Sequence, residues 1–114
     1  MASNGDKNKL KILAQQIRED PNDSFSKFAL ALEFKKRDRY DKARILFESI
    51  RNNDPGYIGV YYHLGHIYEL LNMNEKAVAT YKEGIEIASA NKDHQRTVSE
   101  LKEALAELNT ELNR

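Results

Sequence analysis

The chain contains no cysteine and no tryptophan, and only two of its 114 residues are proline. The absence of cysteine excludes disulfides, thiol nucleophiles and thiolate ligands for a metal ion. No apolar run approaches the length needed to cross a bilayer. The opening residues MASNGDKNKL lack the apolar core of a signal peptide. We therefore expect no membrane segment, no export signal and a cytoplasmic location.

An excess of charge of either sign is also missing. Eighteen Lys and Arg residues balance eighteen Asp and Glu residues, so the formal net charge is zero. The strong basic excess of a nucleic-acid binder is absent, and we expect no nucleic-acid partner. A charged fraction of 32%, with two prolines and five glycines, suits exposed helix surfaces. A length of 114 residues allows one core, which predicts a single domain over residues 1–114.

The sequence repeats a pattern of small and large apolar residues at an interval of 34 positions. The first copy has Leu30, Ala31, Phe34, Ala43 and Phe47, and the second has Leu64, Gly65, Tyr68, Ala77 and Tyr81. Asp20-Pro21 precedes Asp54-Pro55 by the same interval. A fixed period of this size indicates stacked supersecondary units, each of which buries its apolar face only against a neighbour.

These residues resemble the tetratricopeptide repeat family, small bacterial-type members included, in which each repeat is a pair of antiparallel helices. Within 58–91, the residues Tyr61-x-x-Leu64-Gly65-x-x-Tyr68, Ala77 and Tyr81 match the family pattern W-x-x-L-G-x-x-Y…A-x-x-x-F, with Tyr in place of Trp and Phe. Ser89 replaces the closing proline. Residues 24–57 keep the pattern, except that Lys27 occupies the place of the large aromatic residue. Residues 7–21 look like the second half of a truncated unit.

The fold expected from the repeat is all-α, a superhelical stack of two full repeats with an additional helix at each end. We expect helices at about 7–19, 24–37, 40–53, 57–71, 74–90 and 93–112. Pro21 and Pro55 end the helices before them, because the residue ahead of a proline is displaced from the helical region. Asp38 and Asn72 fall where a tight turn between paired helices needs a left-handed residue.

The segment 92–114 departs from the repeat and is expected to be a capping helix. Its apolar residues are spaced by three and four positions and form one narrow stripe: Val98, Leu101, Leu105, Leu108 and Leu112. Arg96, Glu100, Glu103 and Glu107 lie opposite that stripe. A repeat stack must end in a helix with a polar outer face. The alternative is that the stripe forms a seam between two copies of the chain.

The resemblance also implies a binding surface. In this family the first helix of each pair lines a concave groove that receives a segment of a partner protein. Phe28, Leu32 and Lys35 form one stripe on the first of these helices, and Tyr62, His66 and Glu69 form the equivalent stripe 34 residues later. The alternative for Phe28 and Leu32 is that the helix at 7–19 covers them.

Family members that hold the acidic tails of heat-shock chaperones use Lys and Asn on the first helix and a second Asn further along. Phe28, Leu32 and His63 occupy those places in this chain. A chaperone tail of that kind is therefore not the expected ligand.

Two local patterns have both a chemical and a structural interpretation. The spacing His63-x-x-His66-x-x-Glu69 could hold a divalent metal weakly, but no fourth ligand is evident and an ordinary His66–Glu69 pair explains it. The basic segment 35–44 gives residues 24–57 eight basic against five acidic residues, whereas 58–91 has two against four. A solvated turn explains this segment better than a patch for an acidic partner or nucleic acid.

No pattern indicates catalysis, since the chain lacks a nucleophile turn and a glycine-rich phosphate loop. We therefore expect no enzyme activity, cofactor or metal. The predicted function is binding of a peptide or protein segment in the groove, by a protein that is monomeric. The alternative is a homo-oligomeric structural or assembly subunit that associates through the C-terminal helix or an exposed repeat end, so that a dimer is the alternative state.

Overall fold

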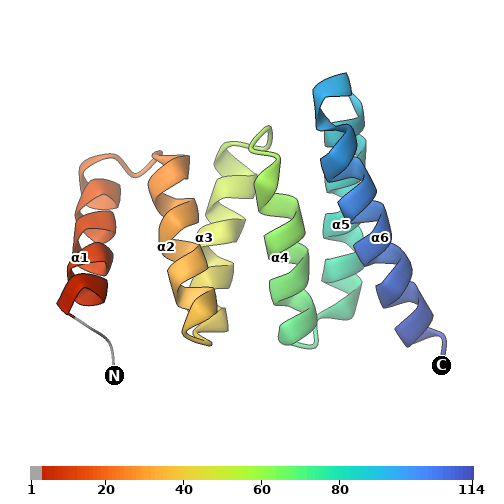
Figure 1. Cartoon of the computed structure of the whole chain (residues 1–114), viewed down its shortest axis with the longest axis horizontal. Helices are drawn as coiled ribbons and strands as arrows, with labels where there is room; N and C mark the ends of the chain where they lie inside the picture. Colours follow the sequence, from red (N-terminus) through yellow and green to blue (C-terminus); the bar gives the residue numbers. More distant parts are fainter. Residues whose placement is uncertain (1–3) are drawn as a thin grey trace. The chain divides into compact units, whose positions relative to one another are not determined.

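The computed structural model of the chain describes the backbone of residues 4–114 and the side chains of residues 7–114. This part of the chain is helical and has no strand, which confirms the all-α prediction (Figure 1). Each α-helix begins and ends within three residues of its expected bounds. The elements are α1 (Asn4–Glu19), α2 (Ser24–Lys36), α3 (Tyr40–Asn53), α4 (Gly59–Leu70), α5 (Asn74–Ser89), the short 3-10 helix η1 (Lys92–His94) and α6 (Gln95–Leu112).

The chain divides into two compact units, Met1–Asp54 and Pro55–Arg114, called unit 1 and unit 2 below. In unit 1, α2 packs against both α1 and α3. In unit 2, α5 packs against both α4 and α6, and α4 also contacts α6. The finer division into a half repeat (7–21), two repeats (24–57 and 58–91) and a capping segment (92–114) stays a prediction.

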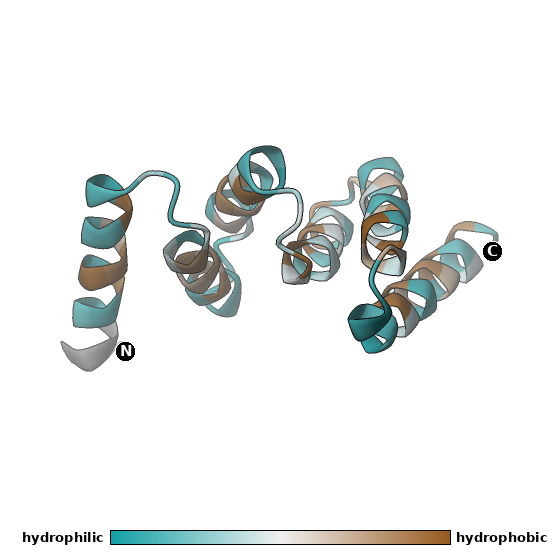
Figure 2. Ribbon diagram, turned by 90° about the horizontal axis from the view of Figure 1, so that it is seen from above, coloured by the Kyte–Doolittle hydropathy of each residue, from teal (hydrophilic) through white to brown (hydrophobic). Residues whose placement is uncertain are grey.

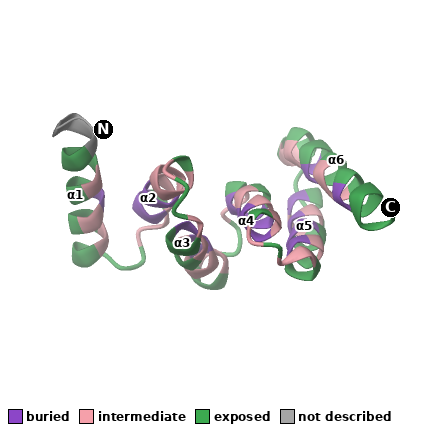
Figure 3. Cartoon of the chain, turned by 90° about the horizontal axis from the view of Figure 1, so that it is seen from below, coloured by how far each residue is buried: buried purple, intermediate pink, exposed green. Residues whose placement is uncertain are grey.

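The core of unit 1 is formed by the repeat residues of α2 and α3 together with one residue of α1. Figure 3 shows that the buried residues of these helices gather along one side of each. The ring of Phe28 meets that of Phe47 edge-on, with centroids 5.8 Å apart. The buried apolar residues are Leu13, Leu30, Ala31, Ala43, Phe47 and Ile50.

Lys27, which replaces the large aromatic residue of the family pattern, is accommodated in the core of unit 1. The side chain is 6% exposed, and its Nζ donates a hydrogen bond to Ser49 Oγ over 2.9 Å. In unit 2 the same repeat position is Tyr61, which is fully buried and donates from its hydroxyl to the Pro55 carbonyl oxygen over 2.5 Å. Both side chains therefore fill the space between paired helices, and each directs its polar end to an acceptor.

Unit 2 brings its helices together at two glycines. A Cβ at Gly65 would lie 2.3 Å from the Tyr81 ring, and one at Gly84 would lie 2.5 Å from the Tyr61 Cβ. The absence of a side chain at these places therefore allows α4 and α5 to approach closely. The buried apolar residues of unit 2 are Val60, Tyr61, Leu64, Ile67, Tyr68, Ala77, Tyr81, Ala88, Val98, Leu101 and Leu108.

The ends of the first helices in each pair confirm the turn prediction. Asp38 and Asn72 have φ angles of 62° and 58°, in the left-handed region. The N–H of the following residue then reaches back across the helix end, from Arg39 to the Phe34 carbonyl and from Met73 to the Tyr68 carbonyl, each over 2.8 Å. These bonds satisfy carbonyl groups that the end of a helix would otherwise leave unpaired.

The apolar stripe of α6 faces the rest of unit 2 over most of its length. Val98, Leu101 and Leu108 are buried, and Leu105 is half-buried. Leu112 at the end of the helix is 47% exposed. The stripe therefore lies against α5 and part of α4 within the same chain, and Figure 2 shows apolar (brown) and polar (teal) residues alternating along α6 towards the C-terminus.

Candidate functional site

The stripe predicted on α4 begins with an exposed aromatic ring. Tyr62 is 39% exposed, whereas its neighbours Tyr61 and Tyr68 on the same helix are buried. The Tyr62 ring lies edge-on to the His63 ring at 5.5 Å and is tilted against the His66 ring at 6.4 Å. The structure thus brings Tyr62 and His66 together on one face of α4, as their spacing of four predicts.

Glu69, the third residue of this stripe, is anchored by the second helix of the pair. Its carboxylate accepts a hydrogen bond from the Tyr81 hydroxyl on α5. Burial raises the pKa of Tyr81, the hydrogen bond to Glu69 raises it further, and the charges of Glu69 and Glu107 act in the same direction. The hydroxyl therefore remains protonated near neutral pH and holds the Glu69 carboxylate in place.

A cavity of about 450 Å³ opens beside Tyr62, between α4 and α6. Tyr62 forms one wall, and Glu100, Glu103, Ala104 and Glu107 of α6 form the other. The spacing of these glutamates predicts that they lie on the polar outer face of a capping helix, away from Tyr62. The structure instead places them at the same cavity, so that unit 2 has a hollow with an aromatic wall and an acidic wall.

The missed glutamates carry a signal that the sequence does contain. Adding the 34-residue period to His66 and Glu69 gives Glu100 and Glu103. In a continuing stack, α6 would therefore present these residues where α4 presents His66 and Glu69. The pattern was hidden because Gln95 and Lys102 replace the two aromatic residues that mark the repeat at Tyr61 and Tyr68.

The residues predicted on α2 are half-buried. Phe28 contributes part of its ring to the core through Phe47, and Leu32 keeps part of its surface exposed. Burial lowers the pKa of the Lys35 ammonium group. Helix α1 packs on α2 through contacts such as the ion pair from Lys9 to Glu33, at 2.8 Å, and leaves Phe28 and Leu32 partly accessible.

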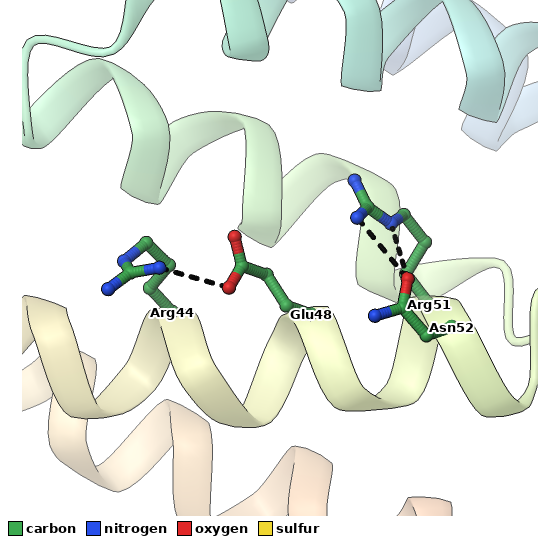
Figure 4. A network of polar contacts seen from close by, with 4 residues as sticks. All are labelled: Arg44, Glu48, Arg51 and Asn52. Atoms are coloured by element: carbon green, nitrogen blue, oxygen red, sulfur yellow. Dashed lines mark hydrogen bonds and ion pairs between the residues drawn. The ribbon is translucent and has the colours of Figure 1, made fainter.

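Several side chains of the basic segment 35–44 interact within unit 1. Arg44 forms an ion pair with Glu48 one turn further on α3, at 3.0 Å (Figure 4). Beyond the segment on the same helix, Arg51 donates to Asn52. The Lys42 ammonium lies 5.5 Å from the centre of the Phe34 ring. These contacts fit the interpretation of the segment as a solvated helix surface.

Within residues 7–114, no group of three or more His, Cys, Asp and Glu residues could hold a metal ion. His63, His66 and Glu69 therefore do not form such a group. No helix in the described part of the chain combines the length and apolar character needed to cross a membrane.

The repeat period, the helix pairs and the close approach at Gly65 together define a helical repeat protein. The sequence profile of the tetratricopeptide repeat family matches residues 58–91. The crystal structure of a tetratricopeptide repeat domain protein from Salinibacter ruber is 41% identical, with a TM-score of 0.73 over 77% of this chain and 97% of that one. The chain belongs to the tetratricopeptide repeat family. A comparison with curated proteins finds no match.

Two more distant structures share the fold. PcrH, in complex with the chaperone-binding region of PopD, has a TM-score of 0.86 at 14% identity, over 94% of this chain and 80% of that one. The TPR2B domain of yeast Sti1, in a complex with pHsp70, has a TM-score of 0.83 at 13% identity, over 94% of this chain and 85% of that one. At such identities the likeness establishes the helical arrangement alone.

Proposed function

We propose that this protein is an interaction module in which unit 2 binds a segment of a partner protein beside α4. The observation that carries the proposal is the exposed ring of Tyr62 above the cavity between α4 and α6. An exposed aromatic side chain that lines a hollow surface is typical of a residue that anchors a partner. PcrH and the Sti1 domain, which have the same fold, were each solved with a bound partner, and this supports the class of function.

The binding surface consists of Tyr62, His66 and Glu69 with the α6 wall of the cavity. Glu69 is fixed by Tyr81, and Tyr62 lies against two imidazole rings, so little side-chain freedom is lost when a partner binds. On α2, Phe28, Leu32 and Lys35 stay a prediction for a second contact surface. Their half-buried state leaves a smaller contact area than that of Tyr62.

The test is a pull-down from a lysate of the source organism with Tyr62→Ala and a control, Lys82→Ala, on the exposed face of α5. We expect Tyr62→Ala to weaken binding of the parent's partners by about 2 kcal/mol or more, as loss of a central aromatic anchor does. The control should keep them. Circular dichroism should show the same helicity for both variants. Loss of partners with Lys82→Ala but not with Tyr62→Ala would place the binding surface elsewhere.

Exposed apolar side chains in unit 1 support the alternative of self-association. Val98, Leu101 and Leu108 of the α6 stripe are buried within unit 2, which leaves Leu105 and Leu112 as the part of the stripe open to another copy. Ile12 and Phe25 of unit 1 are 58% and 72% exposed, and they provide apolar surface at the N-terminal repeat end. Light scattering on the parent and on Phe25→Ser distinguishes the two functions, since a dimer that this change dissociates would identify an assembly subunit.

A further inference from the structure

The cavity beside Tyr62 is rich in uncompensated negative charge. Three glutamates of α6 line it, and each is exposed. Arg96 forms an ion pair with Glu100 at 3.4 Å, but its side chain is 93% exposed. Between residues 7 and 114, neither Glu103 nor Glu107 takes part in an ion pair or a side-chain hydrogen bond. The Tyr62 side chain lines the same space, and the face of an aromatic ring carries the negative end of its quadrupole.

The charge of the whole of unit 2 has the same sign. Residues 55–114 contain nine acidic and six basic side chains, whereas residues 1–54 contain nine acidic and twelve basic ones. Unit 2 therefore has a formal net charge of −3, although the whole chain is neutral. A cavity of one sign in a unit of the same sign attracts ligands of the opposite charge and repels acidic ones.

We propose that the cavity between α4 and α6 binds an arginine side chain of a basic segment in the partner protein. The guanidinium group stacks on Tyr62, and its fork donates to the carboxylates of Glu103 and Glu107. Arginine fits better than lysine because its planar group can stack on an aromatic face and form paired hydrogen bonds at the same time. Ala104 leaves space for the aliphatic stem. This inference rests on the proposed function and names its ligand class.

The probe is a short fluorescent peptide in which arginine alternates with alanine, compared by anisotropy with the same peptide carrying glutamate or citrulline in place of arginine. The test variant is Glu103→Gln with Glu107→Gln. The control is Glu83→Gln with Glu86→Gln on α5, which removes the same two charges from exposed positions away from the cavity. We expect the parent and the control to bind the arginine peptide within about twofold of each other, and the test variant to bind at least about tenfold more weakly, or roughly 1.4 kcal/mol.

Salt and a Tyr62 variant separate this site from general charge attraction. Raising the salt from about 0.1 M to about 1 M shortens the Debye length from roughly 10 Å to roughly 3 Å and should weaken binding to the parent. Tyr62→Leu should weaken binding of the arginine peptide several-fold at both salt concentrations, because it removes the ring on which the guanidinium group stacks. The leucine still supplies an apolar contact, so the loss measures the stacking alone. Equal weakening by the test and control variants, or equal binding of the citrulline peptide, would overturn the proposal.

Two further outcomes show which part of the proposal is wrong if the arginine peptide does not bind as expected. If Tyr62→Ala loses the natural partners but the arginine peptide does not bind, then the surface is correct and the ligand class is not. If analytical ultracentrifugation shows a dimer that Glu103→Gln with Glu107→Gln dissociates, the occupant is the basic surface of a second copy, and the partner proposal is overturned.

Discussion

Lys27 shows how one residue can keep a repeat intact while it breaks the family pattern. Its methylene stem lies in the space that Tyr61 fills in unit 2, and its ammonium group reaches Ser49 Oγ. Ser49 Oγ accepts a hydrogen bond from the ammonium group and the Asp23 carboxylate attracts it, and together they offset only part of the cost of removing the charge from water. Lys27 is therefore a position where unit 1 is less stable than its packing allows.

We predict that Lys27→Met raises the free energy of unfolding by about 1 kcal/mol or more, because methionine fills the same space without a charge. Ser49 Oγ keeps a donor in the variant, since the Asn53 amide also donates to it, over 3.3 Å. Urea titration measures the change. Lys82→Met, at an exposed position, is the control and should change stability by less than about 0.5 kcal/mol. A loss of stability in Lys27→Met would show that the ammonium contact is worth more than its desolvation costs.

The sequence could identify Lys27 as a departure but could not say how it is accommodated, because the answer depends on Ser49, 22 positions away. The same holds for Glu69, whose partner Tyr81 lies on the following helix. By contrast, Asp38 and Asn72 were predictable in full, since a left-handed turn residue follows from local geometry alone. Residue roles set by neighbours along the chain could be predicted, whereas those set by contacts between helices required coordinates.

At the scale of helices, α5 is confined between α4 and α6 at Gly84. A Cβ there would lie 2.5 Å from the Tyr61 Cβ and 3.0 Å from the Leu101 Cδ1. The first of these atoms is attached directly to the backbone of α4, so it moves only if the helix moves. The spacing of three helices therefore depends on one missing side chain, which the repeat pattern did not single out.

Gly84→Ala is expected to lower the free energy of unfolding by up to about 2 kcal/mol. Alanine gains roughly 1 kcal/mol in helix propensity, but the forced displacement of α4 or α6 costs about 1–3 kcal/mol. Thermal unfolding followed by circular dichroism measures the difference. Gly56→Ala is the matched control, because nothing lies within 4 Å of the added Cβ and the backbone φ there is not positive. It should be neutral or stabilising by about 0.5 kcal/mol. Equal effects of the two changes would refute the close packing of α5.

The helices themselves could be predicted closely, because apolar periodicity, Pro21, Pro55 and the two turn residues all act locally. The candidate site was predicted only in part. Tyr62, His66 and Glu69 followed from the family's groove positions. Glu100 and Glu103 were missed, although they continue the period, because α6 packs on one side only and so does not need the aromatic residues by which a repeat is recognised.

At the scale of the molecule, unit 2 depends on α6 to cover the apolar side of α5. Leu101 is fully buried at this contact. We predict that Leu101→Glu abolishes cooperative unfolding of unit 2, since it places an unpaired charge in the core, a change that typically costs several kcal/mol. Ser99→Glu adds the same charge at an exposed position of the same helix and should cost about 0.5 kcal/mol or less. Urea titration followed by circular dichroism would measure both.

A folded Leu101→Glu variant that sediments as a monomer, when the parent is a dimer, would instead mean that Leu101 faces another copy. The same outcome would remove the basis for the cavity beside Tyr62, because that cavity requires α6 to lie against α4 of its own chain. The stability test of the cap is therefore also a test of the architecture of the binding surface.

The division of the chain at Asp54 also separates its chromophores. All four phenylalanines lie in residues 1–54, five of the six tyrosines lie in residues 55–114, and there is no tryptophan to mask either. The near-ultraviolet tyrosine band therefore reports almost entirely on unit 2, while the far-ultraviolet helix signal reports on both units. If the denaturation curves at the two wavelengths coincide, the two units unfold together as one cooperative unit. If the curves separate, they give the stability of each unit directly. The unlabelled protein thus carries its own spectroscopic measure of how far cooperativity extends in a short repeat array.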